Sequence, residues 1–136
     1  MTVYLVDTCI WRDFIEKRVS RTGNSLVDAA ERFFEQIILH GDTLLISPVL
    51  DIELGRYAQD AAFLTLFQLL ERQIVRIPIH SRDVDNAKAL SDQRALPFND
   101  CLLAVLAQRH HAIIVTQDKH FLRLQDICST KTAYQF

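Results

Sequence analysis

Residues 4–15 read YLVDTCIWRDFI, and this short stretch indicates the class of fold. The apolar run Tyr4–Val6 is too short for a helix and ends at Asp7, after which Cys9–Ile15 has the spacing of apolar residues typical of a helix. A buried strand that passes directly into a helix is the first half of a strand–helix–strand unit. The stretch therefore predicts an α/β protein whose first strand and first helix are joined by an acidic residue.

The same alternation continues through the rest of the chain. Ser25 and Ser47–Pro48 are typical helix starts, and Gly41 is a typical helix stop. Strands separated by helices favour parallel pairing with right-handed crossovers, so we expect a three-layer sandwich in which one open, twisted sheet carries helices on both faces. The further strands are expected at Thr43–Ile46, Ile74–Ile79, Ala112–Val115 and from Ile127 onward, and the further helices around Val27–Ile38 and at Val49–Ala58, Asp60–Arg72, Ser81–Arg94, Cys101–Arg109 and Lys119–Leu124.

Length and composition fit one packed domain over residues 1–136. Hydrophobic residues make up 49% and charged residues 24% of the chain, which are ordinary values for a globular protein. No apolar run approaches the roughly 20 residues of a membrane helix, and the start does not have the pattern of a secretory signal, so we expect a cytoplasmic protein. Cys9, Cys101 and Cys128 lack metal-site spacing, and we expect them to be small buried residues.

Four acidic residues fall where a parallel sheet places its ligand site. Asp7 directly follows the first strand, and Asp118 comes shortly after the fourth. Glu53 lies in the helix after the second strand, and Asp100 lies at the start of the apolar helix that leads into the fourth. Because the carboxyl ends of parallel strands share one edge of the sheet, we expect these carboxylates to converge there.

Two interpretations of these acids stay open. Asp7, Asp100 and Asp118 could each be a helix cap or first-turn acid, worth about 0.3–1 kcal/mol through the helix dipole. Glu53 and Asp100, however, share helix faces with apolar residues, where a carboxylate is costly unless it is paired or binds a metal. Clustered carboxylates with no arginine or lysine beside them favour a hard divalent cation, Mg²⁺ or Mn²⁺. Such an ion can activate water for phosphodiester hydrolysis.

Around these acids the sequence resembles a known family. The blocks VDTCIW, ISPVLDIELGR, PFNDCLLAVLAQRH and AIIVTQDKHF are similar, in order and spacing, to the four acidic blocks of the PIN domain. The short connections look most like the VapC branch, the ribonuclease toxins of type II toxin–antitoxin pairs. The resemblance covers essentially the whole chain. It implies a parallel sheet of order 3-2-1-4-5, Mg²⁺- or Mn²⁺-dependent cleavage of RNA, a homodimer and a small antitoxin partner.

The resemblance carries over residue by residue. One departure is His120, which stands where a fifth acid often occurs and which we interpret as a surface histidine. Another is Cys9, where many relatives carry serine or an aliphatic residue. The matching positions are Asp7, Glu53, Asp100 and Asp118 for the four acids, Thr8 for the hydroxyl residue after the first acid, and Thr116 for the threonine of the last block.

The chemistry of these side chains suggests separate roles. Asp7 and Asp100 are expected to bind the metal directly, and Asp118 directly or through water. Glu53 has the longer reach, and we expect it to orient the attacking water or accept its proton. The remaining candidates are hydrogen-bonding partners of the acids, namely Thr8, Asn99 and Thr116, and basic residues that would hold the RNA backbone, namely Arg12, Lys17, Arg18 and Arg21.

Other functions stay open. The chain could be a catalytically weak or inactive PIN-fold module that binds RNA or protein, or an RNA-processing nuclease that is not a toxin. A phosphotransferase of the haloacid-dehalogenase type would use Asp7 as its nucleophile, but it needs an aspartate where Cys9 stands. A receiver-like signalling domain also binds Mg²⁺, but its phosphoacceptor aspartate at a central strand end is missing.

Two features predict protein contacts. The uncompensated carboxylates predict an inhibitory partner that docks beside them and delivers an arginine or lysine. The segment Phe63–Leu70 is apolar on nearly every side, so we expect it to be deeply buried or part of an interface.

Overall fold

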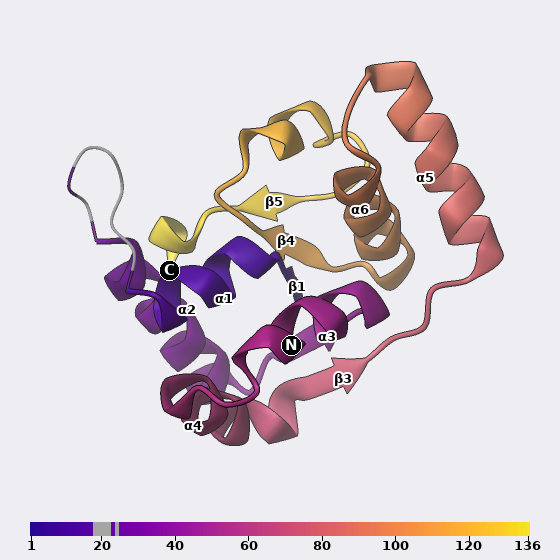
Figure 1. Cartoon of the computed structure of the whole chain (residues 1–136). Coiled ribbons are helices and arrows are strands. Elements are labelled where there is room, and N and C mark those ends of the chain that lie inside the picture. The colour runs from indigo at the N-terminus through magenta and orange to yellow at the C-terminus, as the bar shows by residue number, and fades with distance from the viewer. Residues whose placement is uncertain (18–22, 24) are drawn as a thin grey trace.

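The structure is a computed structural model that describes residues 1–17, 23 and 25–136. Within these residues the strands form one five-stranded sheet in the order β3-β2-β1-β4-β5, and every neighbouring pair is parallel (Figure 1). This confirms the predicted 3-2-1-4-5 order. It differs from the 2-1-3-4-5 order of receiver domains, so the receiver interpretation is wrong. The strands are β1 (Val3–Val6), β2 (Thr43–Ile46), β3 (Ile74–Arg76), β4 (Ile113–Val115) and β5 (Thr130–Lys131).

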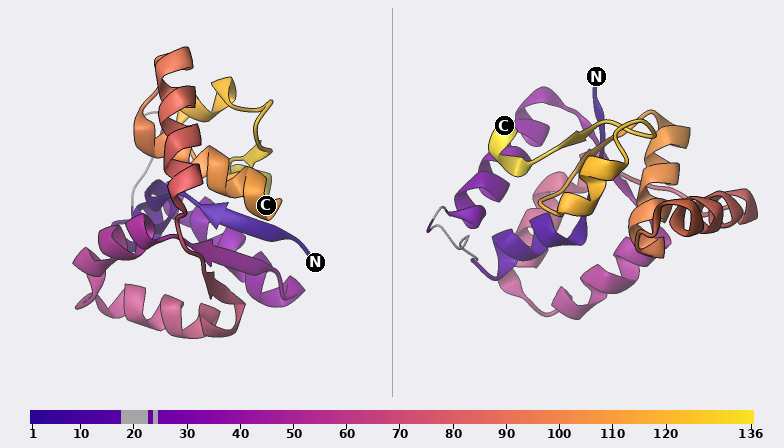
Figure 2. Two further views of the ribbon diagram at one scale, coloured as in Figure 1. Left: turned by 90° about the vertical axis from the view of Figure 1, so that its right-hand side faces the viewer. Right: turned by 90° about the horizontal axis from the view of Figure 1, so that it is seen from above.

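Helices cover both faces of this sheet, as predicted. Successive side chains of a strand point to opposite faces, so Leu5 packs with α5 and α6 while Tyr4 and Val6 pack with α1, α2 and α4. Figure 2 shows the two groups of helices on opposite sides of the strands. The helices are α1 (Thr8–Ile15), α2 (Leu26–His40), α3 (Pro48–Leu54), α4 (Ala61–Leu70), α5 (Ser81–Arg94) and α6 (Phe98–His110), with 3-10 turns η1 (Gly55–Tyr57), η2 (Glu71–Gln73), η3 (Lys119–Arg123) and η4 (Ala133–Gln135).

Several predicted boundaries shift, and the largest shift has a clear cause. The third strand ends at Arg76 instead of Ile79, because Ile77 still donates its N–H to the sheet but Pro78 has none to donate. Helix α6 begins at Phe98 instead of Cys101, so Asn99 lies in its first turn and not in a preceding loop, while Asp100 lies at the start of the helix as predicted. The helices expected to end at Ala58 and Arg72 finish as the 3-10 turns η1 and η2. The helix expected at Lys119–Leu124 is the 3-10 turn η3. The fifth strand, expected from Ile127 onward, contains only Thr130 and Lys131.

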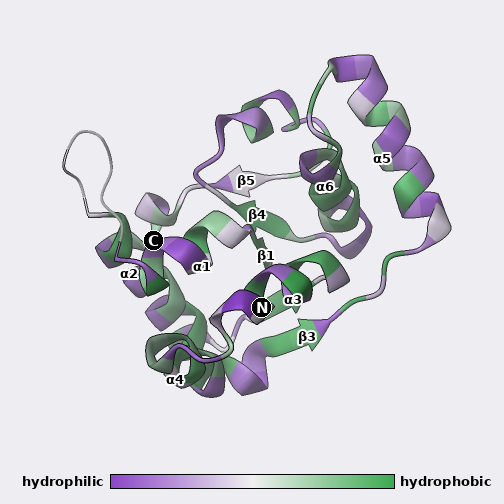
Figure 3. Cartoon of the chain, viewed as in Figure 1, coloured by the Kyte–Doolittle hydropathy of each residue, from purple (hydrophilic) through white to green (hydrophobic). Residues whose placement is uncertain are grey.

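The apolar helix α4 is divided between core and surface. Phe63, Leu66 and Leu70 are buried, whereas Leu64 and Leu69 are 50% and 62% exposed. The prediction of burial therefore holds for one side of the helix. In Figure 3, β4 and α6 are largely hydrophobic, as expected for elements buried on several sides, while α5 alternates between polar and apolar residues.

An ion pair joins α5 to α6, the helix that carries Asp100. Arg109 donates from Nε and Nη2 to the Asp83 carboxylate at 3.0 and 2.9 Å, and also to the carbonyl of Pro78 at 2.9 Å. Burial alone would raise the pKa of Asp83, but hydrogen bonds from the His80 N–H and from Arg109 lower it below its ordinary value. The pair thus anchors the amino end of α5 against α6.

Two of the three cysteines are buried as expected. Cys101 and Cys128 are buried, whereas Cys9 is only half-buried, and all three are free thiols. Among the helices of the described residues, none combines the length and the apolar character needed to cross a membrane.

Candidate functional site

A cleft of about 370 Å³ lies at the carboxyl ends of the central strands. Its walls come from the end of β1, from α1, from α3 after β2, from the first turns of α6 and from the segment after β4. Thr116 is buried outside the wall and reaches the cleft through a hydrogen bond to Asp7. The predicted residues that line the cleft are Asp7, Thr8, Arg12, Glu53, Asn99, Asp100 and Asp118.

Asp7 lies between β1 and α1 and is fixed by several hydrogen bonds. Its backbone N–H donates to the carbonyl of Val115 at 3.0 Å, which ties the end of β1 to the end of β4. One carboxylate oxygen accepts the N–H of Thr8 at 2.8 Å, so Asp7 is the N-cap of α1. The other accepts the hydroxyl of Thr116 at 2.8 Å. Asp7 is therefore a helix cap that also faces the cleft, and the two interpretations of this acid are compatible.

Thr116 and Cys9 connect the first acidic block to the last. Besides donating to Asp7, the Thr116 hydroxyl accepts the N–H of Asp118 at 3.0 Å. The Cys9 sulfur accepts the N–H of Gln117 at 3.5 Å and lies 3.7 Å from Asp7 Oδ2. Burial raises the pKa of Cys9 to about 12, so this residue is a neutral thiol at physiological pH. These contacts hold the two aspartates in a fixed relation.

Glu53 enters the cleft from α3. The helix starts at Pro48, and the Ser47 hydroxyl accepts the N–H of Leu50 at 3.2 Å, which caps the first turn. This start places Glu53 in the second turn, facing α1. There the Thr8 hydroxyl donates to Glu53 Oε2. Thr8 is thus the hydrogen-bonding partner that the sequence predicted, and its bond is to the glutamate.

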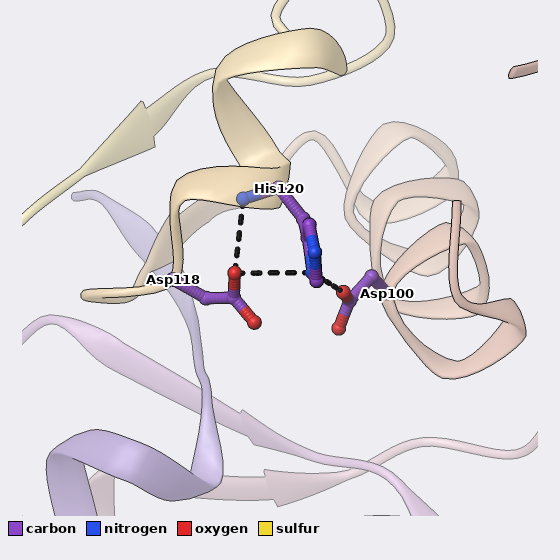
Figure 4. Close-up of side chains that lie close together, drawn as sticks. All are labelled: Asp100, Asp118 and His120. Atoms are coloured by element: carbon purple, nitrogen blue, oxygen red, sulfur yellow. Dashed lines mark hydrogen bonds and ion pairs between the residues drawn. The ribbon is translucent and has the colours of Figure 1, made fainter. Parts of the chain in front are cut away.

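His120 occupies the space between two of the acids. Its Nδ1 lies 2.8 Å from Asp100 Oδ2 and 3.2 Å from Asp118 Oδ1 (Figure 4). The histidine side chain is 50% exposed, so the surface prediction is right about exposure, but the imidazole points into the acidic cluster. The prediction of a surface histidine is therefore confirmed, and the structure adds its contacts with the two acids. Its position in the sequence, where the resembled family often carries an acid, is the signal that points to these contacts.

Burial shifts the protonation of two carboxylates. It raises the pKa of Asp7 above its ordinary value, against the opposing hydrogen bonds from Thr116 and Thr8. Burial likewise raises the pKa of Asp100; the hydrogen bond from His120 opposes this, while the charge of Asp118 adds to it. Burial thus makes the charged form of both carboxylates less favourable in the folded protein, and a bound cation would favour that form.

Two arginines line the same cleft, which corrects the expectation of carboxylates without basic neighbours. Arg12 reaches it from α1, and its buried Nε has no hydrogen-bond partner among the described residues. Arg56 reaches it from η1 and was not predicted. Lys17 is exposed and outside the cleft wall. The other two basic candidates, Arg18 and Arg21, lie outside the described residues.

The donor atoms at the cleft fit a divalent cation. Asp100 and Asp118 of the cleft wall and the adjacent His120 each offer one ligand atom, and these atoms all lie within 4.8 Å of one another. Asp7 and Glu53 supply further carboxylates from the same cleft. Carboxylate oxygens are the ligands of Mg²⁺ and Mn²⁺, so the site has the composition of a centre for either ion.

Comparisons with known proteins agree with this architecture. Three solved structures share the fold: a toxin–antitoxin complex from Klebsiella pneumoniae (20% identity, TM-score 0.70, covering 96% of this chain and 98% of that chain), VapBC2 from Rickettsia felis bound to a DNA fragment from its promoter (17%, 0.64, 96% and 98%), and FitAcB from Neisseria gonorrhoeae (11%, 0.60, 98% and 99%). No curated protein sequence matches the chain.

A family model gives the assignment. The model described as "PIN domain" matches residues 4–127, a span that contains Asp7, Glu53, Asp100 and Asp118. This match agrees with the parallel sheet and its 3-2-1-4-5 order. The chain belongs to the PIN domain family.

Proposed function

We propose that this protein is a divalent-metal-dependent endoribonuclease and the toxin of a type II toxin–antitoxin pair, acting in the cytoplasm. The observation that carries the proposal is the convergence of Asp7, Glu53, Asp100 and Asp118 in one cleft of a PIN-family chain. Four separate connections supply these acids, so only the folded protein assembles them. The raised pKa values of Asp7 and Asp100 support a site in which a bound cation would stabilise the charged carboxylates.

The residues have distinct tasks in this proposal. Asp7, Asp100 and Asp118 hold a Mg²⁺ or Mn²⁺ ion, which when bound activates water and stabilises charge on the phosphodiester oxygens. Thr8 engages one carboxylate oxygen of Glu53, and the other oxygen orients the attacking water and accepts its proton. Thr116 keeps the Asp7 carboxylate oriented toward the cleft.

The arginines of the cleft wall support a phosphate substrate. A guanidinium group matches phosphate oxygens with paired N–H donors, and both Arg12 and Arg56 lie beside the acids. Asn99 is exposed in the first turn of α6 and offers a further donor. We propose RNA as the substrate that carries these phosphates because the sequence resembles the VapC-type ribonucleases.

Replacing Arg56 should weaken substrate binding more than it slows chemistry. Arg56→Gln is expected to raise the KM for RNA about tenfold, because a charge-assisted hydrogen bond to phosphate is worth about 1.5–3 kcal/mol. The kcat should fall less, and the dependence of KM on salt should become shallower. Arg72→Gln is the matched control, since Arg72 is exposed on η2 and outside the cleft wall. Equal KM values for the two variants would contradict this role.

The experiment that tests the function is RNA cleavage by the purified protein. Cleavage should require Mg²⁺ or Mn²⁺ and should stop when EDTA removes the ion. Binding of RNA and divalent ions without cleavage would instead support the catalytically weak binding module.

An antitoxin partner is the second part of the proposal. The similar structure from Klebsiella pneumoniae is a toxin–antitoxin complex, and the one from Rickettsia felis is VapBC2 bound to a DNA fragment from its promoter. An inhibitor that delivers an arginine or lysine to Asp7 and Asp100 would neutralise them and displace the metal in one step. We expect the protein to copurify with a small protein encoded directly upstream. Full ribonuclease activity of the resulting complex would argue against inhibition at this cleft.

A homodimer also belongs to the proposal. The exposed Leu64 and Leu69 of α4 supply apolar surface of the kind that an interface covers.

A further inference from the structure

The strongest unassigned feature beside the cleft is the imidazole of His120, which contacts two of the acids that line it. It comes from η3 and points at Asp118, on its own turn, and at Asp100, on the first turn of α6 (Figure 4). Its Nδ1 lies 2.8 Å from Asp100 Oδ2 and 3.2 Å from Asp118 Oδ1. One nitrogen therefore faces two carboxylates from different elements.

The short turn fixes this arrangement. Asp118 is the N-cap of η3, and its Oδ1 accepts the backbone N–H of His120 at 2.9 Å. The backbone of Asp118 is held in turn by the Thr116 hydroxyl. The histidine and the aspartate are consequently positioned by main-chain bonds that do not depend on the ion pair between their side chains.

The separations between the donor atoms suit a shared ion. Two adjacent ligands of an octahedral ion, each at about 2.1 Å, lie about 3 Å apart. The two distances from His120 Nδ1 are close to this value. The three donor atoms all lie within 4.8 Å of one another, so an ion beside Nδ1 would contact all three side chains once the Asp100 and Asp118 oxygens take up the same spacing.

The type of donor bears on the choice of metal. A site made of carboxylates alone suits Mg²⁺, whereas an imidazole nitrogen adds affinity for transition metals such as Mn²⁺. We propose that His120 is a metal ligand through Nδ1, beside Asp100 and Asp118, and that it makes the cleft bind Mn²⁺ in preference to Mg²⁺. This inference rests on the proposed function, because the ion is the one that the nuclease would use.

A different role predicts the opposite result. If His120 only bridges the carboxylates by hydrogen bonds, its removal leaves Asp100 and Asp118 repelling each other, and a divalent cation should bind as tightly as before or more tightly. If His120 is a ligand, its removal should weaken Mn²⁺ binding at least about tenfold, since even the loss of an outer-shell partner costs that much. Affinity for Mg²⁺ should change less.

The test combines calorimetry with electron spin-echo spectroscopy of the Mn²⁺-loaded protein. Wild type should show coupling of Mn²⁺ to an imidazole nitrogen. His120→Ala should lose this coupling and bind Mn²⁺ at least about tenfold more weakly. His120→Asp should also lose the coupling while restoring an oxygen ligand, so its ratio of Mn²⁺ to Mg²⁺ affinity should fall. His111→Ala is the matched control, because His111 is exposed at the far end of α6 and should keep both properties.

The outcomes separate this inference from the proposed function. Tight Mn²⁺ binding without nitrogen coupling, or unchanged affinity in His120→Ala, overturns the ligand role and leaves the nuclease proposal standing. Failure of the wild-type protein to bind either ion overturns both.

Discussion

Asp7→Asn should reduce metal-dependent RNA cleavage at least about a hundredfold, which corresponds to about 2.7 kcal/mol of transition-state stabilisation. Asparagine keeps the shape of the side chain and can still accept the N–H of Thr8, so α1 retains its cap. What the substitution removes is the negative charge that a divalent ion requires. Asp100→Asn should have an effect of the same size.

A matched acid separates this effect from a general loss of charge. Asp51 lies on the same helix as Glu53 but pairs with Arg76 at 2.9 Å and does not line the cleft, so Asp51→Asn should cleave RNA like wild type. All variants must be purified free of host nucleases. Equal cleavage by wild type and Asp7→Asn would remove the catalytic assignment. If the protein is a toxin, expression of wild type should arrest growth and expression of Asp100→Asn should not.

Saturating Mn²⁺ should raise the melting temperature of the wild-type protein by about 8–14 °C. An ion that binds only the folded state at a hundred times its Kd stabilises that state by about 2.7 kcal/mol. In a domain of this size each kcal/mol corresponds to roughly 3–5 °C. Na⁺ at matched ionic strength should have no comparable effect. Differential scanning fluorimetry with and without each ion measures the shift.

The effect of Asp7→Asn and Asp100→Asn on the melting temperature should be different when no metal is present. Burial raises the pKa of Asp7 and Asp100 in the folded protein, so each carboxyl group stabilises the folded state at low pH, where it is protonated. This contribution is lost as the pH rises through the raised pKa. At neutral pH, Asp7→Asn and Asp100→Asn should therefore melt at or above the temperature of wild type. Both should lose most of the Mn²⁺ increment. A wild-type protein that is indifferent to Mn²⁺ and Mg²⁺ at tens of millimolar would mean that the acids are helix caps alone.

The interactions that complete the cleft depended on the folded structure. Thr116 bonds to Asp7 across 109 positions of the chain, and Thr8 bonds to Glu53 across 45. Arg56 lines the same cleft from the turn η1, in which the helical segment that starts as α3 ends. Local sequence patterns contain no information about which distant side chains will meet.

Some local predictions failed for a different reason. The predicted third strand runs through Pro78, although proline cannot donate to the sheet. The predicted helix before the fourth strand starts at Cys101, although α6 begins at Phe98, directly after Pro97. In both cases a proline is a local signal for the boundary that the pattern of apolar residues does not contain.

The parallel α/β class and the expected meeting of the acids at one edge of the sheet followed from the sequence pattern, whereas the order 3-2-1-4-5 followed from the resemblance to the PIN domain. Apolar periodicity, caps and stop signals are local, and in a parallel sheet the residue after each strand must lie at the same edge, so the pattern predicts that Asp7 and Asp118 lie together. The direction of His120, which is half-exposed and yet turned toward Asp100 and Asp118, comes from the tertiary structure, because the orientation of a side chain on a short turn depends on what the rest of the fold places opposite it.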